Sequence, residues 1–418
     1  MKKGFTLIEL LAVIVILAVI AVIAVPIVLN IINDTKESAT LRSAEFYLRG
    51  LETSIATSVL NNIQVPDGKH FIMEDGNICL STLNNNRCTG DILKVEMDGE
   101  VPTEGTITIK DGEIKKVDLI LSDKEIWIDP FTGKIEYKPA PGLYDENDKL
   151  IKTWEELNEI SQNEYGMNFK ELVESDDAND DYTGYAGIVV DSIQGAYQLI
   201  LDNSVTKIGD YAFNLSYNLK SLIIPDSVTS IGICVLDDSN IESIVFGAGV
   251  TSFDTVSRIG YNFSMNYTIT TIIVDPDNPI YDSRDNCNAI IETATNTLLL
   301  GGGNTVIPKS VTSIEEAFYG RSNLTSITIP SSVTHIGSSA FAETSLESIT
   351  IPESVTSIGE EAFANGWYLT EVTILSNEIN IAESAFYDCE KLTTIYYNGN
   401  IEGATWIPEG VTVKPIGT

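Results

Sequence analysis

The sequence predicts an α+β protein in which a long N-terminal helix and a small antiparallel β-sheet are followed by a β-rich solenoid. Three observations predict this fold class. An apolar run at the N-terminus passes into an amphipathic helical pattern, short strands separated by turns come next, and a repeat of about 22 residues fills the C-terminal half. The predicted boundaries divide the chain into residues 1–4, 5–62, 63–138, 139–184 and 185–418.

The first element is the apolar run at residues 5–29. A run of more than about 18 apolar residues predicts a helix that crosses a membrane. Lys2 and Lys3 precede it, which predicts a cytoplasmic N-terminus and an extracellular location for everything after Asn33. A cleavable secretory signal is the alternative. Its core would be shorter, and no small-x-small cleavage site follows this run.

The residues around the single charge in this run carry a resemblance. The sequence KGFTLIEL at residues 3–10 resembles the processing and assembly motif of type IV pilins and pseudopilins. The resemblance implies that a prepilin peptidase cuts between Gly4 and Phe5, and that the new N-terminal residue Phe5 is then N-methylated. Glu9 matches the glutamate of that family, and Pro26 matches the proline that interrupts its helix.

Physical chemistry explains why a pilin helix would need these residues. A carboxylate at the centre of a bilayer costs about 2.5–3.5 kcal/mol, so Glu9 requires a partner. After cleavage, the amine of Phe5 in one subunit can pair with Glu9 of a neighbouring subunit and set the axial register of the filament. The alternative is that Glu9 only lies at the polar interface. Pro26 lacks a backbone N–H, so we expect a kink or local melting there.

The composition limits the classes of function. With 418 residues, the chain is long enough for two or three domains. Its 60 acidic and 25 basic side chains give a formal net charge of −35. Such a surface repels phosphates, so direct binding of nucleic acid is disfavoured, whereas it keeps an exported protein soluble. Five cysteines are too few for a disulfide-rich scaffold.

The helix is expected to continue to about Asn61, because apolar residues recur at helical spacing. They are Leu41, Ala44, Leu48, Leu51, Ile55 and Val59. Turn signals then separate seven predicted strands. These are His70–Met73, Asn77–Leu80, Ile92–Glu96, Thr106–Lys110, Lys115–Leu121, Glu125–Ile128 and Lys134–Tyr137. An antiparallel sheet packed on the upper half of the helix is what the resemblance to pilins implies.

Two cysteines in this head, Cys79 and Cys88, flank a loop rich in asparagine. A disulfide between them is chemically allowed outside the membrane and would close the loop. The alternative is a pair of free thiols.

The segment 139–184 is predicted to link the head to the solenoid and to cap it. Residues 138–142 (KPAPG) predict a stiff connector, and Thr153 is placed to cap a short helix. The acidic loop Asp176–Asp181 has four aspartates that could bind calcium. It lacks the glycine and the final glutamate of an EF-hand, so a solvated acidic turn is the favoured interpretation.

The solenoid is predicted from a recurring sequence. SVTKIGDYAF at residues 204–213 returns in similar form at residues 310–318, 332–341 and 354–363. The spacing belongs to the leucine-rich class of solenoids, in which neighbouring coils bury each other's backbone edges. One phenylalanine per coil is expected to join a single internal ladder. The set is Phe213, Phe318, Phe341, Phe363 and Phe386.

The pattern IP-x-SVTSIG-x-x-AF closely resembles the BspA-type leucine-rich repeat. A longer unit at residues 274–301 resembles the extended variant of that family. Families with this repeat include surface proteins that adhere to host or microbial partners, so the resemblance implies adhesion to an extracellular protein or glycan.

No enzyme, cofactor site or metal site is predicted. The two histidines, His70 and His335, lie in different domains and form no visible metal cluster or nucleophile–base pair. The glycines at 301–303 precede neither a lysine nor a helix, so they predict a turn and not a phosphate loop. Seven aromatic residues are candidates either for a binding face or for core and edge packing. They are Tyr261, Tyr267, Trp367, Tyr368, Tyr396, Tyr397 and Trp406.

These observations and resemblances together predict a non-enzymatic type IV pilin-like subunit. We expect it to be a minor or tip subunit of a filament that displays its repeat domain outward. Its expected partners are the prepilin peptidase and methyltransferase, other pilin subunits, the cytoplasmic membrane before assembly, and an extracellular protein or glycan. Two alternatives remain: a pseudopilin of a secretion or DNA-uptake machine, and a main filament subunit with the solenoid as a spacer.

Overall fold

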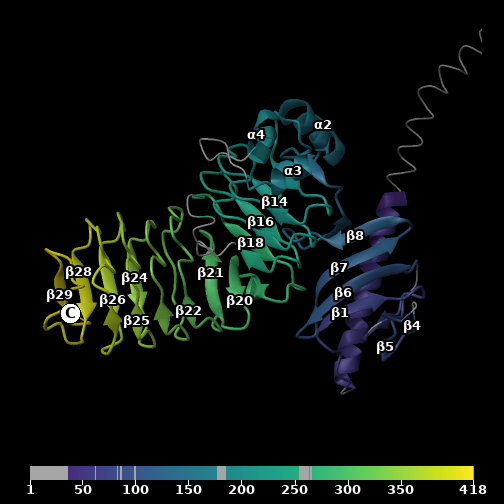
Figure 1. Ribbon diagram of the computed structural model, residues 1–418. Helices are drawn as coiled ribbons and strands as arrows, with labels where there is room; N and C mark the ends of the chain where they lie inside the picture. Colours follow the sequence, from purple (N-terminus) through teal and green to yellow (C-terminus); the bar gives the residue numbers. More distant parts are fainter. Residues whose placement is uncertain are drawn as a thin grey trace, which may run out of the picture. The chain divides into compact units, whose positions relative to one another are not determined.

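The computed structural model describes two compact units, one that ends at Pro139 and one that begins at Ala140 (Figure 1). The described residues are 36–61, 63–81, 83–84, 87–97, 100–176, 185–253, 263 and 266–417. Within these ranges, no helix is long and apolar enough to cross a membrane. The predicted membrane-spanning run lies outside them, and so do Gly4, Phe5, Glu9 and Pro26.

The first unit is built on a helix that is described over residues 36–60. The predicted stripe is buried at Ala44, Leu48, Leu51 and Ile55, so most of the helical pattern is confirmed. The prediction for Val59 is wrong, since this side chain is 58% exposed. The sheet does not cover the last turn of the helix. The helical spacing of apolar residues does not show at which residue the contact with the sheet ends.

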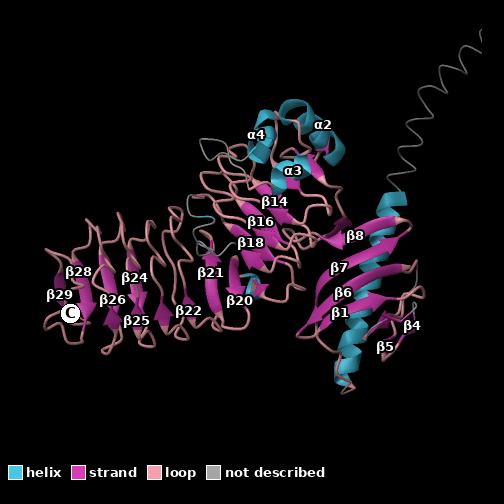
Figure 2. Cartoon of the chain, in the orientation of Figure 1, coloured by secondary structure: helices cyan, strands magenta, loops and turns pink. Residues whose placement is uncertain are grey.

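A seven-stranded antiparallel sheet covers the buried face of this helix, in the order β5-β2-β1-β6-β7-β8-β9 (Figure 2). Its strands are β1 (Gly68–Ile72), β2 (Ile78–Cys79), β5 (Ile92–Leu93), β6 (Glu104–Lys110), β7 (Glu113–Leu121), β8 (Lys124–Ile128) and β9 (Ile135–Tyr137). Each matches a predicted strand. Alternate residues such as Ile107, Ile109, Val117 and Leu119 are buried in the core with the helix, as expected for a half-buried sheet. The small hairpin of β3 (Leu83–Asn84) and β4 (Arg87–Cys88) was not predicted.

The second unit begins with a cap. It comprises β10 (Gly142–Tyr144), β11 (Leu150–Thr153), α2 (Trp154–Tyr165), α3 (Phe169–Glu174) and α4 (Tyr185–Ser192). The predicted helix cap at Thr153 is confirmed by a capping box with Glu156. The predicted connector is shorter than expected, because Gly142 already starts β10, which pairs with the first strand of the solenoid. The cap therefore covers the open end of the first coil.

The coils of the solenoid contribute strands to two parallel sheets in each stack. In the N-terminal stack, one sheet has β12 (Gln198–Ile200), β14 (Ser221–Ile223), β16 (Ser243–Phe246) and β18 (Thr271–Val274), and the other has β13 (Lys207–Ile208), β15 (Ser230–Ile231) and β17 (Ser252–Phe253). In the C-terminal stack, one sheet has β22 (Ser313–Ile314), β23 (His335–Ile336), β25 (Ser357–Ile358) and β27 (Asn380–Ile381), and the other has β24 (Ser348–Ile351), β26 (Glu371–Ile374), β28 (Thr394–Tyr397) and β29 (Thr412–Lys414).

An antiparallel insertion separates the two stacks. It consists of β19 (Tyr281–Asp282), β20 (Ala289–Glu292) and β21 (Thr297–Gly301), and β21 pairs in parallel with β22. Successive residues of a strand point to opposite faces, and the register between β20 and β21 shifts between Ile290 and Ile291, where Ile290 pairs with Leu300 and Ile291 with Leu298. Accordingly, Ile290 and Leu300 belong to the core of the N-terminal stack, whereas Ile291 and Leu298 belong to that of the C-terminal stack. The insertion is thus a wall shared by two cores.

The predicted phenylalanine ladder is present but shorter than expected. Phe318, Phe341, Phe363 and Phe386 stack with centroid separations of 5.1, 5.4 and 5.3 Å and interplanar angles of 6–9°. Trp406 closes the ladder, with its ring centroid 6.2 Å from that of Phe386.

The prediction that Phe213 joins the same ladder is wrong, because this residue lies in the separate core of the N-terminal stack. In the next coil, Leu236 takes the place of the phenylalanine. The backbone N–H of Phe213 donates to the carbonyl of Val235, the residue before Leu236, which aligns the two coils. The presence of a phenylalanine in the repeat does not show whether the neighbouring coil also has one. Here Leu236 and then the insertion interrupt the ladder.

The two stacks are also joined by Arg321, the largest fully buried side chain among the described residues. Its Nε donates to the carbonyl of Gly301 at 2.9 Å, and its Nη1 donates to the carbonyls of Phe263 and Asn266 at 2.8 and 2.9 Å. Burial lowers the pKa of Arg321 to about 10, although the charge of Asp237 opposes this shift. The guanidinium therefore replaces water as the partner of three carbonyl groups at the junction.

We expect Phe341→Ala to reduce the free energy of unfolding of the second unit by about 3–5 kcal/mol, because it leaves a cavity between two stacked rings. Phe341→Leu should cost less, since Leu236 occupies the equivalent position in another coil. Urea unfolding of the full chain, followed by tryptophan fluorescence, measures both. Equal losses for the two variants would contradict a packing role of the ladder.

We expect Arg321→Met to destabilise the second unit by about 3 kcal/mol or more, because it leaves the three buried carbonyls without donors. Lys309→Met is the matched control, since Lys309 is an exposed cation in the same stack. It should change stability by less than about 0.5 kcal/mol. The same urea unfolding series compares the two, and indistinguishable midpoints would show that Arg321 does not hold the junction.

Candidate interaction surfaces

The predicted cysteine pair is joined. Cys79 in β2 and Cys88 in β4 form a disulfide, one of the two alternatives that the sequence left open. The bond closes a short loop and tethers the β3–β4 hairpin to the sheet. A loop of this length predicts a stabilisation of about 3 kcal/mol through the unfolded state. The pair therefore has a structural role at the edge of the head.

The predicted acidic loop is described only at Asp176, since its remaining residues lie outside the described ranges. The Asp176 carboxylate lies 2.6 Å from Nζ of Lys207 in β13, and both side chains are largely exposed. Among the described residues, no group of three or more histidine, cysteine, aspartate or glutamate side chains is arranged to hold a metal ion.

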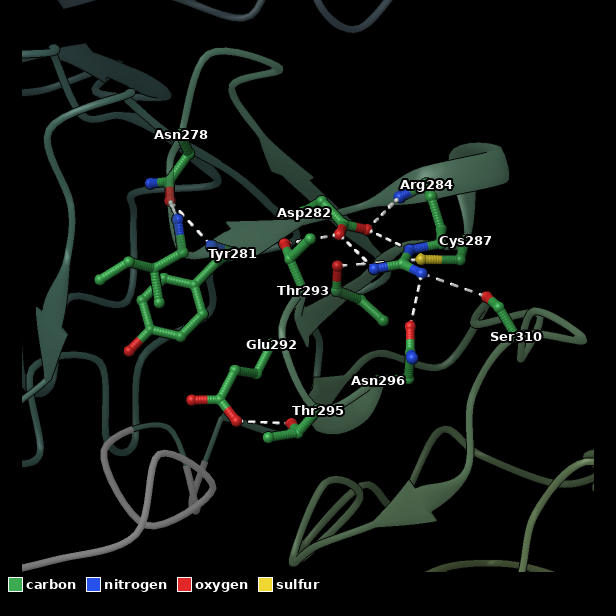
Figure 3. A network of polar contacts seen from close by, with 12 residues as sticks. Asn278, Tyr281, Asp282, Arg284, Cys287, Glu292, Thr293, Thr295, Asn296 and Ser310 are labelled. Atoms are coloured by element: carbon green, nitrogen blue, oxygen red, sulfur yellow. Dashed lines mark hydrogen bonds and ion pairs between the residues drawn. The ribbon is translucent and has the colours of Figure 1, made fainter. Parts of the chain in front are cut away.

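The insertion carries a network of polar contacts (Figure 3). Arg284 binds both carboxylate oxygens of Asp282, with Nε–Oδ1 and Nη2–Oδ2 distances of 2.7 and 2.5 Å. Thr293 donates to Asp282 Oδ2, and Arg284 also donates to Asn296 and Ser310 (Figure 3). Burial raises the pKa of Asp282, but the hydrogen bonds from Arg284 and Thr293 outweigh it and leave this pKa below its usual value. The network clamps the hairpin to the next coil.

His335 has neighbours that the sequence reading missed. Its Nδ1 lies 2.5 Å from Ser357 Oγ, and its Nε2 lies 3.4 Å from Glu315 Oε1. The repeat length was a sufficient signal, because it places residues 335 and 357 in register on adjacent strands. Nearby backbone donors are already used, since the amides of Gly337 and Gly359 donate to carbonyls of the preceding coil. The arrangement is an exposed polar row across the sheet.

The predicted aromatic candidates divide between surface and core. Tyr267, Trp367 and Tyr368 are 38%, 48% and 50% exposed, and Tyr396 is half-buried. Tyr397 is buried and packs edge-to-face on Trp406 at the end of the ladder. Tyr261 lies outside the described residues. Tyr217 and Tyr387, which the sequence reading did not select, are 53% and 65% exposed.

Trp367 and Tyr368 lie in the turn between the Phe363 rung and β26. The amide of Trp367 donates to the carbonyl of Asn365, and that of Leu369 donates to the carbonyl of Gly366. A Cβ at Gly366 would lie 3.1 Å from the carbonyl oxygen of Phe363 and 3.3 Å from Cys389 Sγ, so a larger residue would strain this tight turn. The turn presents both aromatic rings to solvent.

The repeat shows which residues are usual at this position. The pairing of β24, β26 and β28 places Leu346, Leu369 and Leu392 in equivalent positions of successive coils. In four successive coils this leucine is Leu324, Leu346, Leu369 and Leu392. The two residues before it are, in the same order, Ser322–Asn323, Thr344–Ser345, Trp367–Tyr368 and Glu390–Lys391. Only the third of these four turns has aromatic residues, so the coil itself does not require them.

The geometry defines the class of the second unit: a parallel β-solenoid of the leucine-rich type with an antiparallel insertion. The BspA type leucine rich repeat region matches residues 194–280 and 303–404 in six copies. The prokaryotic N-terminal methylation motif matches residues 1–25. Both resemblances expected from the sequence are therefore confirmed: one chain joins a pilin-type N-terminal motif to BspA-type leucine-rich repeats.

Solved structures with similar chains include a leucine rich cell surface protein from Faecalibacterium prausnitzii A2-165, at 28% identity and a TM-score of 0.36. The match covers 49% of this chain, and this chain spans 60% of the length of that protein. A leucine-rich repeat protein from Eubacterium ventriosum ATCC 27560 is 17% identical, with 71% of this chain and 83% of that chain covered and a TM-score of 0.37. No curated protein matches this chain.

We expect Asp282→Asn to weaken the dependence of stability on acid. The folded-state pKa of Asp282 lies below its unfolded value, so its carboxylate stabilises the fold above the unfolded pKa of about 4. That contribution is lost as the pH falls through the folded pKa. The variant should lose about 2 kcal/mol at pH 7 and show a shallower decline between pH 4 and 2.

Urea unfolding of the full chain across this pH range makes the measurement. Glu353→Gln is the control, because Glu353 is an exposed carboxylate in the same solenoid. It should leave the profile unchanged. An unaltered profile for Asp282→Asn would show that the clamp does not contribute to the acid response.

Proposed function

We propose that this chain is a non-enzymatic, pilin-like surface subunit that assembles through its N-terminal helix and displays its repeat domain for adhesion. The observation that carries the proposal is the presence of both elements in one chain: the methylation motif at residues 1–25 and the BspA-type repeats at residues 194–404 with their insertion. The methylation motif would direct the chain to pilin processing and assembly, and the repeats would supply a large surface for binding an extracellular partner.

The assembly route supplies the first partners. A prepilin peptidase would cleave after Gly4, and methylation would follow at Phe5. The helix would hold the subunit in the cytoplasmic membrane until Glu9 pairs with the terminal amine of a neighbouring subunit. Pro26 would give the helix the bend that packing in a filament needs.

The size of the second unit favours a minor or tip position. It extends from Ala140 to Thr418 and is acidic, with 40 aspartate and glutamate residues against 11 lysine and arginine residues. Such units on every subunit would have to fit around the shaft and would repel one another. A subunit at the tip can carry one unit without either cost.

Two other roles use the same N-terminal motif. A pseudopilin of a secretion or DNA-uptake machine would assemble in the same way, and its acidic solenoid would not contact nucleic acid itself. A main filament subunit would repeat the solenoid along the shaft as a spacer. Adhesion is favoured over both because exposed aromatic side chains on the solenoid provide hot-spot chemistry for a partner.

The processing step is tested by the mass of the N-terminal peptide of the surface protein. We expect this peptide to begin at a methylated Phe5, and we expect Gly4→Val to leave residues 1–4 attached. Glu9→Ala should still be cleaved but should disappear from the sheared surface fraction, because its carboxylate is needed for assembly. A surface protein that retains residues 1–4 would contradict the pilin-type route.

The position in the filament is tested by immunogold labelling with antibody to residues 185–418. Label at filament ends supports a tip subunit, label along the shaft supports a main subunit, and label over the cell surface without filaments supports a pseudopilin. Loss of the chain should reduce attachment of cells to immobilised extracellular protein or glycan. Unchanged attachment would contradict the adhesive role.

A further inference from the structure

The turns that follow the phenylalanine rungs form one continuous edge of the C-terminal stack. We call the part of this edge that contains Tyr319, Glu343, Asn365, Trp367, Tyr368 and Tyr387 the Trp367 edge. Its members come from neighbouring coils. The backbone N–H of Asn365 donates to the carbonyl of Tyr387 at 2.9 Å, and Tyr319 Oη donates to Glu343 at 3.2 Å.

Three aromatic residues of this edge are not needed to fill the core. Trp367, Tyr368 and Tyr387 are about half exposed or more, whereas the ladder residues beneath them are fully buried. Equivalent turns of the stack use Ser322–Asn323 and Thr344–Ser345 instead. Exposed tryptophan and tyrosine in water carry unsatisfied apolar area, and they are the residue types that dominate binding energy at interfaces.

Carboxylates are among the polar groups of this edge. Glu343 accepts hydrogen bonds from Tyr319 and from Asn365, at 3.2 and 3.5 Å, so its carboxylate is held in place on the edge. Counting back from the register of β26 and β28, Glu390 is the residue of the next coil that corresponds in sequence to Trp367. Glu390 and Asp388 are both exposed. The edge and the coil next to it therefore carry three carboxylates, at Glu343, Asp388 and Glu390.

One ring of the edge already holds a cation from the chain itself. Lys391 Nζ lies 4.6 Å from the centroid of Tyr368, within the range of a cation–π interaction. Such contacts contribute about 0.5–1 kcal/mol at exposed sites and about 2 kcal/mol when they are desolvated. This contact shows that a ring of the edge accommodates an ammonium group.

Resting on the proposed adhesive function, we propose that the Trp367 edge is the docking surface for a cationic protein segment, one that presents lysine or arginine side chains. The ammonium or guanidinium groups would lie over the exposed faces of Trp367 and Tyr387 and pair with Glu343 and Glu390. The net charge of −35 steers such a segment toward the chain and disfavours anionic partners. The aromatic rings then determine where on the acidic surface it binds.

The test uses the full chain and three probes: a lysine- and glycine-containing peptide, the same peptide with every lysine acetylated, and a panel of neutral oligosaccharides. The double variant Trp367→Ser, Tyr368→Asn places the residues of the Ser322–Asn323 turn on the edge, so the coil remains compatible. Tyr217→Ser is the matched control, because Tyr217 is an exposed tyrosine at the corresponding position of the N-terminal stack.

We expect the lysine peptide to bind the unchanged protein, and we expect the double variant to weaken this binding by about tenfold or more. Tyr217→Ser should stay within about twofold. Glu390→Gln should weaken binding by a few-fold and reduce its sensitivity to salt. The acetylated peptide has the same length but no lysine cations, so it should not bind.

Equal binding of the lysine peptide by the double variant and the unchanged protein would overturn the proposal, since acidic charge alone would then account for it. Oligosaccharide binding that is lost in the double variant would overturn it in favour of a glycan partner. Cell attachment separates this inference from the adhesive function. If attachment needs the chain but not Trp367 and Tyr368, the docking surface is wrong and adhesion stands. If attachment does not need the chain, adhesion itself is wrong.

Discussion

The register between successive coils is the constraint on which the solenoid depends. Each coil must return its strands to the position where they pair with the previous coil, as Ile314, Ile336 and Ile358 do in β22, β23 and β25. This pairing removes backbone donors and acceptors from water, and the stacked phenylalanines fill the space between the two sheets. A coil of another length would break both at once, so the repeat tolerates change mainly in its turns.

Departures from the repeat are therefore informative. The insertion at β19–β21 interrupts the parallel pairing, and the structure compensates with two arginines. Arg284 clamps the hairpin through Asp282, and Arg321 satisfies carbonyls where the two cores meet. The Trp367–Tyr368 turn departs from the repeat without any such structural compensation. Because these two exposed rings do not fill the core and expose apolar area to water, we infer that they contact a binding partner.

Much of the fold could be predicted because its elements have strong periodic patterns. The seven strands of the head, the capping box at Thr153 and the coil pairing follow from alternation, turn chemistry and repeat length. The errors arose where burial depends on a distant segment. Val59 continues the apolar spacing of the helix, but no strand covers it. Phe213 matches the repeat, but Leu236 and the insertion separate it from the other rungs.

The sequence by itself determined the class of this protein, because a contiguous N-terminal motif and a repeat of fixed length are both local patterns. Only the tertiary structure decided which aromatic residues are exposed and which cysteines are joined. Those outcomes, together with the polar row at His335 and the buried position of Arg321, depend on contacts between coils. Such contacts bring together residues far apart in the chain, and their burial is a property of the packed core.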